Sequence, residues 1–393
     1  MSLDYLLVCR NLKDDEIINN FESLNIYTVS KLIEKAELLG LSGNLKREYL
    51  IYVLTHESNL VSITIEKSGG KIGESLRAAF IHDIKNIMPL LKNDIDYFQI
   101  IKDYKPTIMT NNEIYIELRN KLETLDSPED IADVFINYYR RYGYGDIANY
   151  RAFRWKDALV GIKHFENMRL NDLIGYAHQK DLLTGNTEAF INNKPANNVL
   201  LVGARGTGKS SSVKALVNEY YNSGLRLVQI TKPQLVDLPK IMEALRQFAS
   251  KRFIIFLDDL SFEESDSEYK YLKSAIEGGV ESRPENVLIY ATSNRRHLIR
   301  ETWRDRVDGQ DDLYRDDSVN ETISLSDRFG LIIHYYSPSQ SEYLEIIRHM
   351  LNKQGINMTD EQLRIEGLRW EMTHSGRNGR TAQQFVTNYL GQH

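Results

Sequence analysis

The feature that most restricts the fold is an octapeptide, Gly203-Ala-Arg-Gly-Thr-Gly-Lys-Ser210, which directly follows the apolar run 199–202. Its Gly-x-x-x-x-Gly-Lys-Ser spacing is typical of a phosphate-binding loop between a strand and a helix. Glycines let backbone N–H groups turn inward around phosphate oxygens, where a Cβ would obstruct the turn. The following helix directs its positive N-terminus at the same anion. The loop therefore predicts binding of ATP or ADP.

Particular side chains of this Walker A loop have expected roles. Lys209 reaches the β- and γ-phosphates, and Ser210 offers its hydroxyl to Mg²⁺. The predicted nucleotide contacts of the loop are Gly203, Ala204, Arg205, Gly206, Thr207, Gly208, Lys209, Ser210 and Ser211.

Short apolar runs rich in β-branched residues recur from Asn198 onward. They cover residues 199–202, 225–230, 253–257, 287–291 and 331–335, and helical patterns separate most of them. Strands that alternate with helices predict a five-stranded parallel sheet covered on both faces. Helical patterns over 340–353, 359–373 and 381–390 then predict a helical lid. The predicted domains are an α/β P-loop core over 165–337 and a lid over 338–393.

Two of these runs end in polar residues suited to phosphate chemistry. Residues 253–257 lead into Asp258 and Asp259, a Walker B arrangement in which Asp258 is expected to hold Mg²⁺ through water. Asp259 would orient the attacking water, although its side chain is one methylene shorter than that of Glu. Asn294 ends the next strand, where its amide could contact the γ-phosphate or the water. The alternatives are that the acids, or Asn294, only cap the following helix.

Residues 1–155 carry no chemical motif and are predicted to form a mainly helical N-terminal domain of unassigned role, because 17–37 and 78–91 have apolar residues at helical spacing. The stretch 61–70 is ambiguous and alternates like a short strand. The segment 138–146 interleaves tyrosines, arginines and glycines. It is interpreted as a helix end that packs its tyrosines on the next domain; a stacking surface for single-stranded nucleic acid is the less favoured alternative.

Composition excludes several classes of protein. The 393 residues are 42% hydrophobic and 26% charged, which is typical of a folded chain, and the net charge of −6 argues against a nucleic-acid coating protein. A single cysteine, Cys9, excludes an intramolecular disulfide and a cysteine-rich zinc site. No signal peptide or apolar run near the ~20 residues of a membrane span is visible, so a cytoplasmic location without a membrane partner is expected. Residues 303–320 are expected to form a long exposed loop.

Taken together, the motifs from about Leu173 to the C-terminus resemble an AAA+ ATPase. Leu257-Asp-Asp-Leu-Ser-Phe262 and Leu325-Ser-Asp-Arg-Phe-Gly330 resemble, more narrowly, the DUF815 family of predicted AAA+ ATPases. The resemblance implies an adenine contact at Ile174, Gly175 and Tyr176. It also implies that Arg328 acts as a finger on a neighbouring subunit's γ-phosphate, and that Arg380, with Arg377 as a close rival, contacts the phosphates from the lid. Lys209, Asp259, Asn294, Arg328 and Arg380 are then the expected catalytic residues.

The resemblance implies a homo-oligomer that hydrolyses ATP with Mg²⁺ and remodels a protein client that the sequence does not identify. The connection 231–237 lacks the aromatic residue and glycine of the pore loop in ring unfoldases, so threading of a polypeptide is not expected. The alternative function is a nucleotide-dependent assembly switch or loader with slow hydrolysis. Nucleic acid is a less favoured partner of such a loader.

Overall fold

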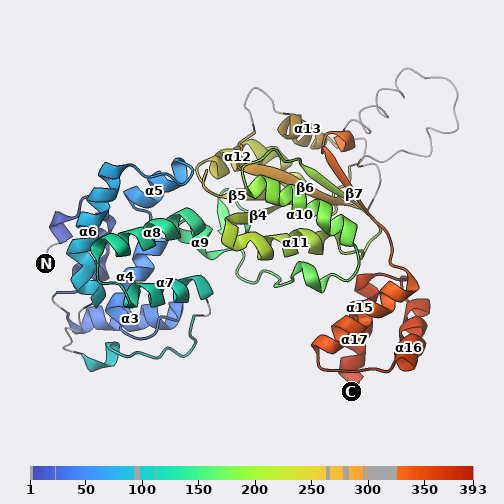
Figure 1. Ribbon diagram of the computed structural model, residues 1–393, viewed down its shortest axis with the longest axis horizontal. Coiled ribbons are helices and arrows are strands. Elements are labelled where there is room, and N and C mark those ends of the chain that lie inside the picture. The colour runs from blue at the N-terminus through green and yellow to red at the C-terminus, as the bar shows by residue number, and fades with distance from the viewer. Residues whose placement is uncertain are drawn as a thin grey trace. The chain divides into compact units, whose positions relative to one another are not determined.

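The computed structural model describes residues 3–22, 24–92, 98–110, 112–262, 266–277, 283–294, 298 and 325–392. The chain forms two compact units (Figure 1). The helical unit comprises Met1–Tyr150 and Gln247–Lys251, and the sheet unit comprises Arg151–Arg246 and Arg252–His393. Within the described ranges, no helix combines the length and hydropathy that a membrane crossing requires.

Short polar residues begin most of the longer helices of the helical unit. The side chains of Asn25, Asn44, Asn59, Asn112 and Ser127 accept hydrogen bonds from backbone N–H groups of the first helical turns. The elements are η1 (Leu3–Tyr5), α1 (Asn11–Asp14), α2 (Glu16–Asn19), α3 (Ile26–Leu39), α4 (Leu45–His56), α5 (Leu60–Lys67), α6 (Glu74–Lys92), η2 (Gln99–Ile101), α7 (Glu113–Glu123), α8 (Pro128–Tyr142) and α9 (Gly145–Asn149). The mainly helical character predicted from the sequence is confirmed.

The ambiguous stretch 61–70 is helical in its first part, where it forms most of α5. Asn59 and Ser62 form a capping box at the start of this helix, and each side chain accepts from the other residue's backbone N–H. Val61 and Ile65 are both fully buried, at a spacing of four residues. The strand-like alternation was misleading because only the helical spacing faces the core.

Three of the four tyrosines of the segment 138–146 are buried within the helical unit itself. Tyr138, Tyr139 and Tyr142 lie on the last turns of α8, which ends at Gly143 with a positive φ of 90°. The Tyr139 hydroxyl donates to the Leu54 carbonyl at 2.7 Å. The packing interpretation therefore fits these three rings better than an exposed stacking surface, although they pack inside their own unit and not on the next one.

A buried ion pair joins two distant parts of the chain within the helical unit. Lys251 Nζ lies 2.9 Å from Glu66 Oε1, and the side chains are 0% and 1% exposed. The same ammonium donates to the carbonyl oxygens of Tyr139 and Arg140 at 3.1 and 2.8 Å, and Ser250 donates to Glu66 at 2.6 Å. These bonds replace water around both charges, so the pair is tolerated in the interior.

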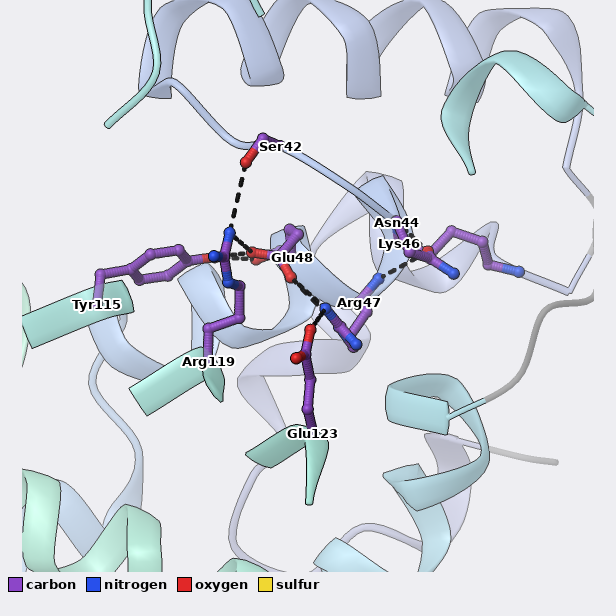
Figure 2. Close-up of polar contacts among 8 residues, drawn as sticks. All are labelled: Ser42, Asn44, Lys46, Arg47, Glu48, Tyr115, Arg119 and Glu123. Atoms are coloured by element: carbon purple, nitrogen blue, oxygen red, sulfur yellow. Dashed lines mark hydrogen bonds and ion pairs between the residues drawn. The ribbon is translucent and has the colours of Figure 1, made fainter. Parts of the chain in front are cut away.

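A second charged cluster surrounds Glu48, whose side chain is fully buried on α4 (Figure 2). Arg47 Nη2 lies 3.0 Å from its carboxylate, Arg119 Nη1 lies 4.0 Å away, and the Tyr115 hydroxyl donates to it at 3.2 Å. Burial raises the pKa of Glu48 even though both arginines oppose the shift. The cluster fixes α7 against α4.

In the sheet unit, a seven-stranded sheet has the order β2-β1-β4-β5-β6-β3-β7. Its strands are β1 (Ala152–Trp155), β2 (Leu159–Gly161), β3 (Val199–Gly203), β4 (Leu225–Ile230), β5 (Arg252–Leu257), β6 (Val287–Ser293) and β7 (Leu331–Tyr335). The five predicted strands β3 to β7 are neighbours and pair in parallel, which confirms the α/β P-loop core.

The strands β1 and β2 were not predicted from the sequence. β1 pairs parallel with β4, and β2 pairs antiparallel with β1, so both extend one edge of the predicted sheet. They are only four and three residues long, too short for their alternation to stand out. Because β1 belongs to the sheet unit, the first segment of the helical unit ends at Tyr150, whereas the sequence predicted a boundary at residue 155.

The helices of the sheet unit cover the sheet and form the lid. They are η3 (Leu170–Asp172), α10 (Ala177–Ile191), α11 (Lys209–Tyr220), η4 (Tyr221–Ser223), η5 (Lys232–Asp237), α12 (Leu238–Arg246), α13 (Tyr269–Glu277), α15 (Gln340–Lys353), α16 (Asp360–Thr373) and α17 (Gly379–Gln392). α10 and α11 lie in front of the sheet in Figure 1, and α15, α16 and α17 follow β7 as a separate cluster. This lid has its own apolar core around Tyr343, Ile347 and Phe385.

We expect Glu66→Gln to destabilise the helical unit by about 3–5 kcal/mol, because it leaves the buried Lys251 ammonium without a counter-charge. Hydrogen exchange of the α5 and α8 amides measures this loss as a lower opening free energy. Glu117→Gln is the matched control, since Glu117 pairs with Lys121 on an exposed helix surface and should matter by about 0.5 kcal/mol or less. If the two substitutions lower the opening free energy equally, the buried ion pair does not contribute more to stability than an exposed pair.

Candidate nucleotide site

The loop between β3 and α11 has the backbone shape that its glycines predict. Gly206 and Gly208 have positive φ angles of 75° and 88°. At Gly203, also at positive φ, an added Cβ would lie 2.0 Å from the carbonyl oxygen of Tyr335 on β7. A side chain at this position would therefore push apart two paired strands, so glycine is required by packing as well as by the turn.

Lys209 directs its ammonium back into the loop. Its Nζ donates to the carbonyl oxygens of Gly203 and Ala204, both at 2.7 Å, and to Asn294 Oδ1 at 3.1 Å. Burial lowers the pKa of Lys209, whereas the nearby Asp259 and Asp258 raise it. These three hydrogen-bond partners are neutral oxygens, so the ammonium presents a positive charge that suits an anion held by the loop.

The two residues predicted to hold the metal meet directly. Ser210 Oγ donates to Asp258 Oδ1 at 2.5 Å. A hydroxyl and a carboxylate from different elements are hard oxygen donors of the kind that Mg²⁺ takes in nucleotide sites. The donor set therefore fits Mg²⁺, with Ser210 and Asp258 as the residues that would hold it.

Thr292 of β6 organises both acidic residues and was not predicted as a site residue. Its hydroxyl donates to Asp258 Oδ1 at 2.6 Å and accepts from the Asp259 N–H at 2.9 Å. Its position two residues before Asn294 was visible in the sequence, but its role depends on the observed register, in which β5 pairs with β6 through Leu257 and Ala291. The next residues along these parallel strands are Asp258 and Thr292, which therefore meet at the sheet edge.

Asp259 and Asn294 also face each other. Asn294 Nδ2 donates to Asp259 Oδ1 at 2.5 Å, and Arg205 lies 3.9 Å from the other carboxylate oxygen. Asp259 has a φ of 54°, a left-handed conformation that costs most non-glycine residues energy and is found often at functional sites. Asn294 thus connects Lys209 and Asp259 through its two amide atoms.

A cavity of about 590 Å³ contains most of the predicted nucleotide contacts. Its lining includes Ile174, Tyr176, Arg205, Gly206, Thr207, Gly208, Lys209, Ser210, Ser211, Asp258, Asp259, Thr292, Asn294 and Arg380. Ile346 and Met350 of the lid add apolar surface near Ile174. Apolar surface for a base and a polar loop for phosphates therefore border one space.

The predicted adenine segment forms a turn into α10. Gly175 and Tyr176 both have positive φ angles, of 79° and 57°. The Tyr176 ring packs against Tyr335 with a centroid distance of 5.0 Å, and its hydroxyl donates to the Tyr336 carbonyl at 2.9 Å. Burial raises the pKa of Tyr176 to about 12.

The two rival lid arginines differ in their surroundings. Arg377 Nε donates to Glu371 Oε1 at 2.8 Å within the lid, and Arg377 lines a second cavity of about 630 Å³. Arg380 lines both that cavity and the one with the phosphate-binding loop. This arrangement favours Arg380 over Arg377 as the lid residue that would reach a nucleotide.

Arg328 forms an ion pair with Glu277 of α13 and is not among the described residues that line the cavity of its own chain. Its expected role as a finger in a neighbouring subunit stays a prediction. Residues 295–297, which follow Asn294, and the expected exposed loop over 303–320 lie outside the described residues.

Two solved structures show partial similarity to this chain. The Thermotoga maritima RuvB Holliday junction branch migration motor is 19% identical with a TM-score of 0.39, over 56% of this chain and 63% of that chain. The C. elegans protein PCH-2 is 16% identical with a TM-score of 0.38, over 57% of this chain and 65% of that chain. This chain thus spans less than two thirds of either protein.

No curated protein sequence matches the chain. The family model described as "Protein of unknown function (DUF815)" matches residues 148–393, which is more than half of the chain. The matched residues contain the whole cavity, the strands β1 to β7 and the lid. The chain therefore belongs to the DUF815 family.

Proposed function

We propose that this chain binds and hydrolyses ATP and works as an oligomeric remodelling machine on a protein client. One observation carries the proposal: Lys209, Ser210, Asp258, Asp259 and Asn294 converge on one cavity through hydrogen bonds that join three adjacent strand ends. Such an arrangement serves phosphoryl transfer, where positioning and charge stabilisation supply most of the catalysis.

Each of these groups has a distinct task in hydrolysis. The loop N–H groups and Lys209 bind the phosphates, and Asp259 with Asn294 holds a water molecule in line with the γ-phosphorus. The water oxygen bonds to phosphorus while the bond to the bridging oxygen breaks, which releases ADP and inorganic phosphate. When bound, Mg²⁺ neutralises charge on the β- and γ-phosphate oxygens. Arg380 adds positive charge from the lid.

The alternative, an assembly switch or loader with slow hydrolysis, is supported by the connection after β4. η5 is a compact 3₁₀ helix in which Thr231 and Gln234 form a capping box and Leu235 is buried. Gln234 also donates to the Trp155 carbonyl at 2.8 Å. A segment held in this way offers no aromatic pore loop, so a role that needs no threading fits it better.

We expect Lys209→Ala to abolish ATP binding and phosphate release, because the positive charge that faces the loop is lost. Binding of a fluorescent ATP analogue and release of phosphate measure the two effects. The control is Lys240→Ala, since Lys240 is exposed on α12 and pairs with Asp237. Wild-type protein that releases no phosphate with Mg-ATP at any protein concentration would contradict the proposed hydrolysis.

Asp259→Ala should retain ATP binding but lower turnover by about 100-fold or more, because the water loses its partner. Light scattering with this variant also separates the two functions. Assembly that follows ATP binding alone, combined with slow wild-type turnover, would favour the switch. If assembly is the same with and without nucleotide, the assembly switch is contradicted.

Thr292→Val should lower turnover about tenfold and raise the Mg²⁺ concentration needed, because Asp258 and the Asp259 N–H lose a shared hydrogen-bond partner. Thr187→Val is the matched control. Thr187 is also fully buried and bonded through its hydroxyl, to Leu183 and Tyr290, but it lies outside the cavity lining. If both variants lower turnover equally, the effect comes from stability and not from the site.

The finger role of Arg328 can be tested by mixing inactive variants. Arg328→Ala and Asp259→Ala proteins should each be inactive, while a mixture should regain part of the turnover. In the mixture, an intact Arg328 from one subunit can meet an intact site of another. No recovery at any ratio, with assembly confirmed, would place the effect of Arg328 within its own chain, where it pairs with Glu277.

A further inference from the structure

The lid touches the phosphate-binding loop at one backbone contact. The N–H of Gly379, the first residue of α17, donates to the carbonyl oxygen of Gly206 at 2.8 Å. Gly206 lies in the middle of the loop and lines the nucleotide cavity. A hydrogen bond therefore joins the start of a lid helix directly to the loop expected to bind phosphate.

Both partners of this contact are glycines, and the space around them explains why. A Cβ on Gly379 would lie 3.2 Å from the Gly206 carbonyl oxygen, and a Cβ on Gly206 would lie 2.5 Å from Asn378 Oδ1. Both distances are shorter than ordinary van der Waals contact, and the second would force a shift. A side chain on Gly206 would thus force Asn378 to move, and a side chain on Gly379 would crowd the Gly206 carbonyl oxygen.

Asn378 supports the contact from the lid side. Its Oδ1 accepts from the Thr381 N–H at 2.9 Å and so caps α17, and its side chain packs against Gly206. Asn378 is 7% exposed, and its Nδ2 lies 3.3 Å from the carbonyl oxygens of Ser375 and Gly376. The residue therefore fixes both the start of α17 and the place where the lid meets the loop.

We propose that Asn378 and Gly379 form a latch that holds the lid on the phosphate-binding loop and positions Arg380 at the nucleotide. Arg380 is the next residue along α17 and lines the cavity, so its backbone is fixed one residue from the latch. A nucleotide then meets a lid that is already docked, and less ordering entropy is lost on binding. The latch rests on the proposed ATPase function but concerns two residues outside the phosphate-binding motif.

Gly379→Ala separates the latch from a purely structural role. Gly379 has no positive φ, and alanine favours a helix over glycine, so helix propensity alone predicts an equal or higher melting temperature. The latch predicts instead a loss of about three- to tenfold in affinity for fluorescent ADP and ATP, as expected when one hydrogen bond is weakened. Gly391→Ala is the matched control, because Gly391 lies on the same helix with nothing within 4 Å of an added Cβ.

The action through Arg380 is tested by a double-mutant cycle. Arg380→Ala and Gly379→Ala should be non-additive for ATP, because displacing Arg380 and removing it cost the same interaction. Asn378→Ala should behave like Gly379→Ala. Asn378→Ser should recover part of the affinity, since serine caps a helix about as well as asparagine. Additive effects would overturn the positioning of Arg380.

Hydrogen exchange measured without nucleotide tests whether the latch contact exists, and the result does not depend on ATP hydrolysis. Amides of residues 378–382 should exchange about tenfold faster in Asn378→Ala than in wild type, because the contact with Gly206 opens. The control Thr359→Ala removes a similar cap from α16 and should leave these amides unchanged. Unchanged exchange in Asn378→Ala would overturn the latch, whereas wild-type protein that binds no nucleotide would overturn only the proposed function.

Discussion

The close approach of the phosphate-binding loop to β7 determines where the candidate site can form. Gly203 ends β3 against the Tyr335 carbonyl, at a distance that excludes any side chain. β3 lies between β6 and β7 in the sheet, and β5 lies on the far side of β6. Because these strands are parallel, their carboxyl ends meet at one edge, which is where ligands bind in open α/β sheets. The lysine, the acids and the amide therefore share one edge.

The chemistry at that edge forms a connected network and not a set of separate side chains. Asn294 joins Lys209 to Asp259, and Thr292 joins Asp259 to Asp258. Each link spans two adjacent strand ends, so a shift of β6 would disturb the ammonium and both acids together. Positional coupling of this kind is what phosphoryl transfer needs, because small displacements of catalytic groups are costly.

The sequence was most informative where the chemistry is local. The loop, the acid pair and Asn294 each follow an apolar strand directly, so a motif and its strand could be read together, and the fold class and their convergence were predicted. Thr292 and the Asn378–Gly379 contact depend on which strands and helices become neighbours, which spacing alone does not reveal. The left-handed backbone of Asp259 has no sequence pattern of its own, and β1 and β2 were missed because they are short.

The helical unit gave the weakest signal, since capping residues mark where its helices begin but not how they pack. Its most unexpected member is the segment Gln247–Lys251, which belongs to it although α12 precedes it and β5 follows it in the chain. The two units are therefore not consecutive modules that a single cut could separate. A chain that started at residue 151 would keep Lys251 but lose Glu66, and so would carry an orphaned cation just before the strand that leads to Asp258. Exchange of the helical unit between relatives would have to replace both of its segments together.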